Sequence, residues 1–289
     1  MAVTEVEKPQ PKLIPWTRRL EEIPWWMVAL LLGGLLILYS FYTSKIYREA
    51  LSFLLAGLKL TILITLASFS IAILLGLIAG LGRVSKNAIF YNLSTLYVEV
   101  IRGVPLLVQL LYVAFVLVPL GVDLLNAIGR FLVQHGSPGF LLVVARSLAN
   151  LNIKDINMTV RAIAGLAFGY GAYEAEVFRG GIQSIERGQM EAARSLGMTY
   201  FQAMRYIILP QAIRRMLPPL GNDFIAMLKD SSLVSALAVR ELTQLGKLHR
   251  SRTFRTFETW NTVTFLYLIM TLSLSLLVKF MERRMSFEE

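Results

Sequence analysis

The sequence predicts an all-α membrane protein, and both its composition and its hydrophobic pattern indicate this class. Of the 289 residues, 55% are hydrophobic and 17% are charged, and the mean hydropathy is +0.59. A soluble domain usually has about a quarter of its residues charged. Several apolar runs are also long enough to cross a bilayer core of about 30 Å, which takes roughly 20 helical residues.

Six apolar runs are predicted to span the membrane. They are Met27–Thr43, Phe53–Leu81, Ala88–Pro119, Thr159–Gly181, Met216–Leu237 and Trp260–Lys279. Trp25 and Trp26 precede the first run as interfacial aromatic residues would, and these bulky residues argue against a cleaved signal peptide. In the second run, Gly76 and Gly80 have the spacing that lets two helices approach closely.

The runs divide the chain into regions. Residues 1–26 are predicted to form a cytoplasmic tail, 27–43 an extra N-terminal transmembrane helix, 51–284 the main transmembrane domain and 285–289 a second tail. Within the main domain, 120–158 is expected to be an external insertion and 184–210 a cytoplasmic loop. The apolar run Phe140–Ala149 is too short to cross the membrane, so it is predicted to be an interfacial or re-entrant element.

The Lys and Arg residues near the span ends predict the orientation. They are more numerous in the segments that would be cytoplasmic if both termini are cytoplasmic, as membrane proteins prefer. The stretch "KLHRSRTFRTFE" (247–258) opposes this trend. The formal net charge of +10 is interpreted as orienting helices in lipid rather than as a nucleic-acid surface.

Enzymatic activity is not expected of this chain. It has no Cys, which excludes disulfides, thiolate metal sites and cysteine nucleophiles, and its only imidazoles are His135 and His249. No H-E-x-x-H motif occurs. We therefore predict no catalytic residue, no metal site and no cofactor.

A polar segment, "EAARSLGMTYFQAMRYIILP" (191–210), interrupts the apolar pattern. Gly197 is placed to end a first helix with a left-handed turn, and Thr199 with Gln202 forms a capping-box pattern for a second. The second helix is expected to stop before Pro210. Such a hairpin is tied to a span at each end, so it could transmit a mechanical displacement to the transmembrane helices. A solvated linker between two spans would satisfy the same pattern.

The same segment resembles the EAA loop of ABC-importer permeases. Seven residues fill the fixed places of that pattern: Glu191, Ala192, Ala193, Gly197, Ile207, Leu209 and Pro210. The stretches "YVEVIRGVPLLVQLLY" (97–112) and "GAYEAEVFRGGIQSIERGQ" (171–189) are similar to those of polar amino-acid permeases. An ion-coupled secondary transporter or channel has no physical reason to keep an EAA loop.

The resemblance implies a type I ABC-importer permease with five core transmembrane helices, to which this chain adds one N-terminal span. It also implies a bacterial inner-membrane location, a second permease subunit that is identical or related, and an external solute-binding protein. In this family the EAA loop docks on a dimer of ATP-binding subunits. The chain has no G-x-x-x-x-G-K-[ST] motif, so ATP binding belongs to that partner.

Acidic residues in two spans are candidates for the substrate pathway, because charges at membrane depth are costly. We expect Glu174 and Asp223 to attract the ammonium of an amino acid, with Tyr173 and Asn222 positioning it. Two acids exceed the need of one ammonium, which favours basic amino acids. Alternatively, these acids pair for packing with basic residues, of which Lys229, Arg161 and Arg179 are the candidates.

A repeated E-x-x-R-G motif falls near the cytoplasmic ends of two spans. Its copies place Glu99 with Arg102 and Glu176 with Arg179, each pair on one helical face. These residues are predicted to form ion pairs that shape an inner gate.

Overall fold

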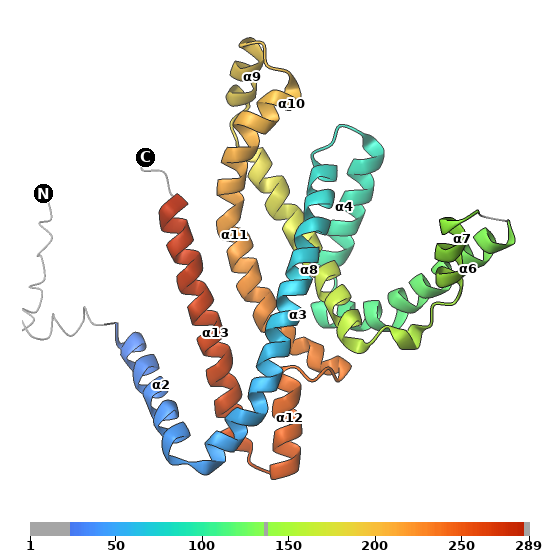
Figure 1. The fold of residues 1–289 in the computed structure, drawn as a ribbon. Coiled ribbons are helices and arrows are strands. Elements are labelled where there is room, and N and C mark those ends of the chain that lie inside the picture. The colour runs from blue at the N-terminus through green and yellow to red at the C-terminus, as the bar shows by residue number, and fades with distance from the viewer. Residues whose placement is uncertain (1–23, 136–137, 286–289) are drawn as a thin grey trace, which may run out of the picture.

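The computed structural model describes residues 24–135 and 138–285, and within these ranges it contains helices and no strand (Figure 1). The predicted tail over 1–26 and the tail over 285–289 lie almost entirely outside them. Six elements make up the body of the bundle: α2 (Trp25–Thr43), α3 (Lys45–Arg83), α4 (Ala88–Arg102), α8 (Met158–Gln183), α11 (Leu209–Asp230) and α13 (Thr256–Met285). The all-α class predicted from the composition is confirmed.

Four stretches are long and apolar enough to cross a membrane by length and composition. They are Trp25–Thr43, Lys45–Arg83, Leu106–Gln134 and Thr256–Arg283. Helices α8 and α11 are also long but carry more polar residues, and α8 is the most enclosed helix of the bundle, with 13 buried residues. A polar helix is tolerated at membrane depth where neighbouring helices enclose it.

Helices α3 and α8 form the central pair. α3 has 39 residues and is therefore about 58 Å long at 1.5 Å per residue. The two helices touch at Gly76, where an added Cβ would lie 2.3 Å from the Cβ of Glu174. Gly80 makes the same kind of contact with Phe178, at 2.8 Å. The predicted close approach through small residues is confirmed.

The predicted third span, Ala88–Pro119, is wrong as a single helix. α4 ends at Arg102, and α5 (Leu106–Tyr112) begins after a break that includes Pro105, which has no N–H to continue the ladder. At this break the buried Gln109 donates hydrogen bonds to the carbonyls of Ile101 (2.7 Å) and Val104 (2.6 Å). The amide thereby adds partners to carbonyl groups at the break, where the regular helical hydrogen bonds end.

The chain after α5 runs without interruption into the insertion. The π-helix η1 (Val113–Leu117) leads into α6 (Val118–Gln134), which pairs with α7 (Phe140–Ala149) as a hairpin. Figure 1 shows this hairpin projecting away from the body of the bundle. Its helices touch at Gly129, where an added Cβ would lie 2.3 Å from the backbone N of Ala149.

The segment predicted to be cytoplasmic forms α9 (Arg187–Ser195), α10 (Tyr200–Ala203) and the π-helix η3 (Met204–Ile208), which joins α11 directly. The expected stop before Pro210 is wrong. Proline is tolerated at the first positions of a helix, and Pro210 occupies such a position in α11. The π-helix before it has already left the regular i→i−4 ladder, so the missing N–H breaks no regular run of bonds.

The last part of the chain differs from the predicted fifth span, Met216–Leu237. The α-helix ends at Asp230 and a 3₁₀ helix, η4 (Ser231–Leu237), follows, closed by Ala238 with φ of 56°. A helix missed in the sequence, α12 (Leu242–Thr253), then packs against α3 and α13. α12 lies at the end of the bundle opposite α9 and α10 (Figure 1).

Candidate functional site

The hairpin of α9 and α10 has the local structure that its sequence predicts. Gly197 adopts φ of +83° in the turn between the helices, a value that L side chains rarely adopt. Thr199 and Gln202 form the predicted capping box. Within α9, Glu191 is exposed at the surface, whereas the neighbouring Ala193 is buried.

The tip of this hairpin exposes large apolar side chains in an otherwise polar segment. Leu196 is 81% exposed and Phe201 is 72% exposed, and Tyr200 and Tyr206 are exposed beside them. A hollow of about 290 Å³ lies among Leu196, Gly197, Met198, Gln202 and Tyr206. Exposed apolar side chains gathered in this way are typical of protein–protein, membrane or ligand contact sites.

The base of the hairpin is packed rigidly on the bundle. Ile208 joins a buried cluster with Phe178 of α8 and Met216 of α11. Ile207 packs against this cluster, Leu209 is half-buried, and Pro210 is exposed. The base of the hairpin is therefore held against both α8 and α11 by close-packed side chains.

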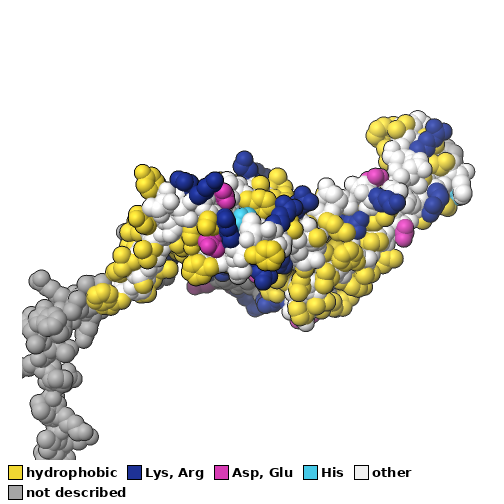
Figure 2. Space-filling model, turned by 90° about the horizontal axis from the view of Figure 1, so that it is seen from below, with side chains coloured by type: hydrophobic (Ala, Val, Ile, Leu, Met, Phe, Trp, Pro, Cys, Tyr) yellow, Lys and Arg dark blue, Asp and Glu magenta, His cyan; other side chains and the backbone are white. Residues whose placement is uncertain are grey.

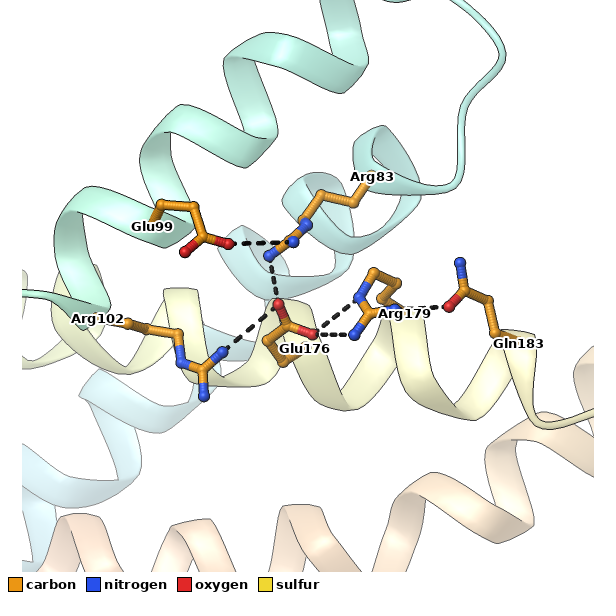
Figure 3. A network of polar contacts seen from close by, with 6 residues as sticks. All are labelled: Arg83, Glu99, Arg102, Glu176, Arg179 and Gln183. Atoms are coloured by element: carbon orange, nitrogen blue, oxygen red, sulfur yellow. Dashed lines mark hydrogen bonds and ion pairs between the residues drawn. The ribbon is translucent and has the colours of Figure 1, made fainter.

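A network of ion pairs ties α3, α4 and α8 together (Figure 3). Glu176 of α8 is its centre, and its carboxylate contacts Arg83, Arg102 at 3.5 Å and Arg179 at 2.6 Å. Arg83 also pairs with Glu99 at 3.3 Å. The predicted pairing within the second motif copy is confirmed. The predicted pair within the first copy, Glu99 with Arg102, does not form. Glu99 pairs with Arg83 of α3 and Arg102 pairs with Glu176 of α8.

Arg83 is the member of this network that the sequence analysis missed. Its side chain is only 12% exposed and it contacts both acids. It belongs to neither motif copy, and the only signal in the sequence was that it is a basic residue at the predicted cytoplasmic end of a span. Its partners lie 16 and 93 residues away in the chain, so no local spacing pairs them.

The polar face of α8 continues from this network toward the middle of the bundle. The Arg102 guanidinium lies over the ring of Tyr173, 5.6 Å from its centroid, and that ring lies 5.8 Å from the ring of Tyr170. The Tyr170 hydroxyl donates a 2.7 Å hydrogen bond to Asp230 at the end of α11. Asp230 is a further acid between these two helices, and no sequence motif pointed to it.

Glu174 is the most unusual side chain of the bundle. It is fully buried, and within the described residues neither of its carboxylate oxygens has a hydrogen-bond partner. Asp223 of α11 is close enough to interact with it electrostatically. The structure therefore brings the two predicted acids together, whereas Tyr173 lies beside Arg102 and Asn222 is exposed on α11.

The basic residues considered as partners for these acids are engaged or directed elsewhere. Arg161 is buried and donates to the carbonyls of Ile153 (2.6 Å) and Ile156 (3.0 Å). Arg179 pairs with Glu176, and Lys229 is exposed. Within the described residues, neither Glu174 nor Asp223 therefore forms an ion pair with any of these three basic residues. The described residues contain no cluster of acids and imidazoles suited to a metal ion.

Comparison with known proteins identifies the family. Residues 72–287 match the family described as the binding-protein-dependent transport system inner membrane component. The glutamine transport system permease protein GlnP of Escherichia coli K12 is 34% identical over 236 residues, covering 82% of this chain and 94% of that protein. The glutamate/aspartate import permease protein GltK of E. coli O157:H7 is 33% identical over 247 residues, covering 86% and 99%.

Solved structures agree in fold. A chain from the crystal structure of an amino acid ABC transporter with histidines has 38% identity and a TM-score of 0.64, covering 81% of this chain and 94% of that one. A chain of the inward-facing MetNI methionine ABC transporter, at 18% identity and a TM-score of 0.56, shows the shared fold alone. The chain thus belongs to the binding-protein-dependent inner membrane component family, as a multi-pass amino-acid ABC-importer permease of the type I fold, with ATP hydrolysis left to a partner.

Proposed function

We propose that this permease forms the substrate pathway of an importer for polar amino acids and that it prefers basic ones. The observation that carries the proposal is Glu174 of α8, whose buried carboxylate has no partner among the described residues and lies close enough to Asp223 of α11 for the two charges to interact. One acid meets the ammonium that every amino acid carries. The second is left for a cationic side chain such as that of arginine, lysine or histidine.

The relatives support the amino-acid class. Their names specify glutamine and glutamate/aspartate, and one solved structure with 38% identity is an amino acid ABC transporter with histidines. The preference for basic substrates rests on the two acids alone. An ion-coupled carrier is not favoured, because the chain belongs to a family of binding-protein-dependent permeases.

The proposal extends to coupling with the ATPase. The exposed Leu196, Phe201 and Tyr206 would enter a groove of an ATP-binding subunit, with Glu191 and Gly197 setting the shape of the hairpin. Ile207, Leu209 and Pro210 would carry the movement into α11. A complete transporter would contain two ATP-binding subunits, a second permease that is identical or related, and an external solute-binding protein.

The proposal also includes an orientation in the membrane and an inner gate. α2 runs toward the α12 end of the bundle and α13 runs away from it (Figure 1), which supports placing both termini on the side of the α9–α10 hairpin. With the ATPase in the cytoplasm, that side is cytoplasmic. The network around Glu176 then lies at the inner end of the pathway and would act as an inner gate, breaking and reforming as α3, α4 and α8 move.

Amide substitutions test the charge-matching proposal. Glu174→Gln and Asp223→Asn keep the side-chain shape and remove one charge each. In proteoliposomes with the ATPase, arginine uptake should fall about tenfold in at least one variant, because a hydrogen bond to a charged group contributes roughly 1.5–3 kcal/mol. Glutamine uptake should fall much less. Asp123→Asn, exposed on α6, is the matched control. Equal losses of arginine and glutamine uptake would refute the preference and leave the importer assignment intact.

A further inference from the structure

The segment around α12 carries an excess of positive charge. Residues 240–255 contain five Lys and Arg residues and one acid, Glu241, which is buried and caps α12 by accepting hydrogen bonds from the N–H groups of Thr243 and Gln244. Figure 2, viewed from below the bundle of Figure 1, shows Lys and Arg gathered on this end. Membrane proteins normally keep such residues on the cytoplasmic side. In the orientation proposed above this end is external, so the excess opposes the usual bias.

Most of these cations have partners within the protein. Lys247 donates to Ser235 at 2.9 Å, and Arg255 pairs with Glu49 at 3.1 Å. Arg250 makes a longer contact of 3.4 Å with Thr256. Arg240 and Arg252 are exposed, and neither has a hydrogen bond or ion pair with any residue in the described ranges. These two guanidinium groups are therefore available to an external anion.

The two arginines line one hollow between α3 and α12. Its volume is about 420 Å³, within the range of small-molecule sites of roughly 300–1,000 Å³. Ser52 adds a hydroxyl, and the remaining lining residues are apolar: Phe53, Ala56, Leu245 and Leu248. The hollow therefore has a cationic rim and a mainly apolar floor, which suits a ligand that is itself part anionic and part apolar.

The hollow continues along an exposed stripe of α3. Ser52, Ala56 and Lys59 follow one another at spacings of four and three, which places them on one helical face. Lys59 is exposed and has no partner among the described residues. The next residues of this stripe, Leu63 and Leu66, are 54% and 53% exposed. A ligand seated in the hollow could thus extend apolar chains along α3 toward the middle of the membrane.

We propose that this hollow binds an anionic phospholipid of the outer leaflet. The phosphate lies between Arg240 and Arg252, because the guanidinium fork matches phosphate oxygens in geometry and charge. The glycerol region contacts Ser52 and the apolar floor, and the acyl chains follow Leu63 and Leu66. A soluble acidic protein would meet the arginines but leave the apolar floor and stripe without partners. The leaflet assigned here rests on the proposed orientation, whereas the phosphate site itself does not.

Lipid binding to the purified transporter complex tests the proposal. The complex in detergent is mixed with short-chain phosphatidylglycerol, phosphatidylcholine of the same chain length, or glycerol 3-phosphate, and bound molecules are counted by native mass spectrometry. The wild type should retain phosphatidylglycerol in preference to phosphatidylcholine. The double variant Arg240→Gln/Arg252→Gln should lose that preference by about tenfold, since charge-assisted hydrogen bonds are roughly twice as strong as neutral ones. Arg250→Gln, on the same helix but outside the lining of the hollow, should retain it.

Several results would overturn the proposal. The proposed site is refuted if the wild type retains the two lipids equally, or if the double variant keeps the wild-type preference for phosphatidylglycerol. Competition by glycerol 3-phosphate at the concentration of the lipid assigns the hollow to a small phosphate ligand instead. Retention of lipid by the permease alone but not by the assembled complex makes the hollow a subunit interface. The charge-conserving pair Arg240→Lys/Arg252→Lys should keep part of the preference, which separates loss of charge from loss of fold.

Orientation is measured separately. The chain has no Cys, so Ser251→Cys introduces a single thiol on the exposed end of α12. A membrane-impermeant maleimide added to intact cells should label it. Labelling only in inverted vesicles would overturn the assignment to the outer leaflet and the proposed orientation together. Lipid binding in the purified complex would still decide the site itself.

Discussion

Arg83, the last residue of α3, donates a hydrogen bond to Glu176, which lies 93 residues later on α8. Arg102 of α4 reaches the same carboxylate, so one acid joins three helices. The network lies toward the end of the bundle that carries the α9–α10 hairpin (Figures 1 and 3). Any relative movement of α3, α4 and α8 at this end must rearrange it.

We predict that Glu176→Gln destabilises the permease and loosens its inner end. The amide removes the charge that three arginines share, and breaking a buried pair costs up to roughly 3–5 kcal/mol. The cost here should be below that, because the Glu176 side chain is 18% exposed. A lower thermal midpoint and a higher ATPase rate without substrate are expected. Glu99→Gln is the control, since its exposed pair contributes less than about 1 kcal/mol. Equal effects of the two variants would contradict the central place of Glu176.

Two substitutions in the hairpin should uncouple ATP hydrolysis from transport. Glu191→Arg reverses an exposed charge, and Gly197→Leu places a side chain at φ of +83°, at a strain of roughly 1–2 kcal/mol. An added Cβ at Gly197 meets nothing within 4 Å, so the strain is local to the turn. We expect near-normal thermal stability with reduced substrate uptake per ATP hydrolysed. Gly188→Leu, also without neighbours within 4 Å, is the matched control. Wild-type uptake by either test variant would disprove the docking role.

The α3–α8 contact should not tolerate a side chain at Gly76. An added Cβ would lie 2.3 Å from the Cβ of Glu174, so the helices must move apart. Overpacking of this kind typically costs about 1–3 kcal/mol. Gly76→Ala is expected to lower the thermal midpoint and to reduce uptake, because Glu174 is displaced. In α2, Gly34→Ala meets no atom within 4 Å and should leave both unchanged. A Gly76→Ala protein as stable as the wild type would show that the two helices are not in contact.

The hairpin of α6 and α7 is predicted to be an external platform for the solute-binding protein. Gly129→Leu should open it, because even a Cβ at this position would lie 2.3 Å from the Ala149 backbone. We expect weaker stimulation of ATPase activity by the binding protein, with the basal rate unchanged. Gly121→Leu, at the start of α6 with open space around it, is the control. If stimulation is unaffected by Gly129→Leu, the hairpin has no part in receptor docking.

The sequence by itself determined the class of the molecule and the local structure of its hairpin. Hydrophobic run length indicated membrane helices because the bilayer thickness sets how many residues a span needs. Gly197, Thr199 and Gln202 specified the turn and the cap because those signals act within a few residues. The match of Glu191 to Pro210 with the EAA pattern was also local, and the family assignment agreed with it.

Only the tertiary structure decided which polar residues meet. Arg83 pairs with Glu176, and Tyr170 with Asp230. Each pair joins different helices, and no spacing along the chain encodes those contacts. The helix boundaries at Pro105 and Pro210 were also decided there. Gln109 donates to carbonyls at the first break, and the π-helix before Pro210 lets the second helix continue. The physical reason is that backbone groups in a membrane need partners from within the protein, and which side chain or turn supplies them depends on how the helices pack.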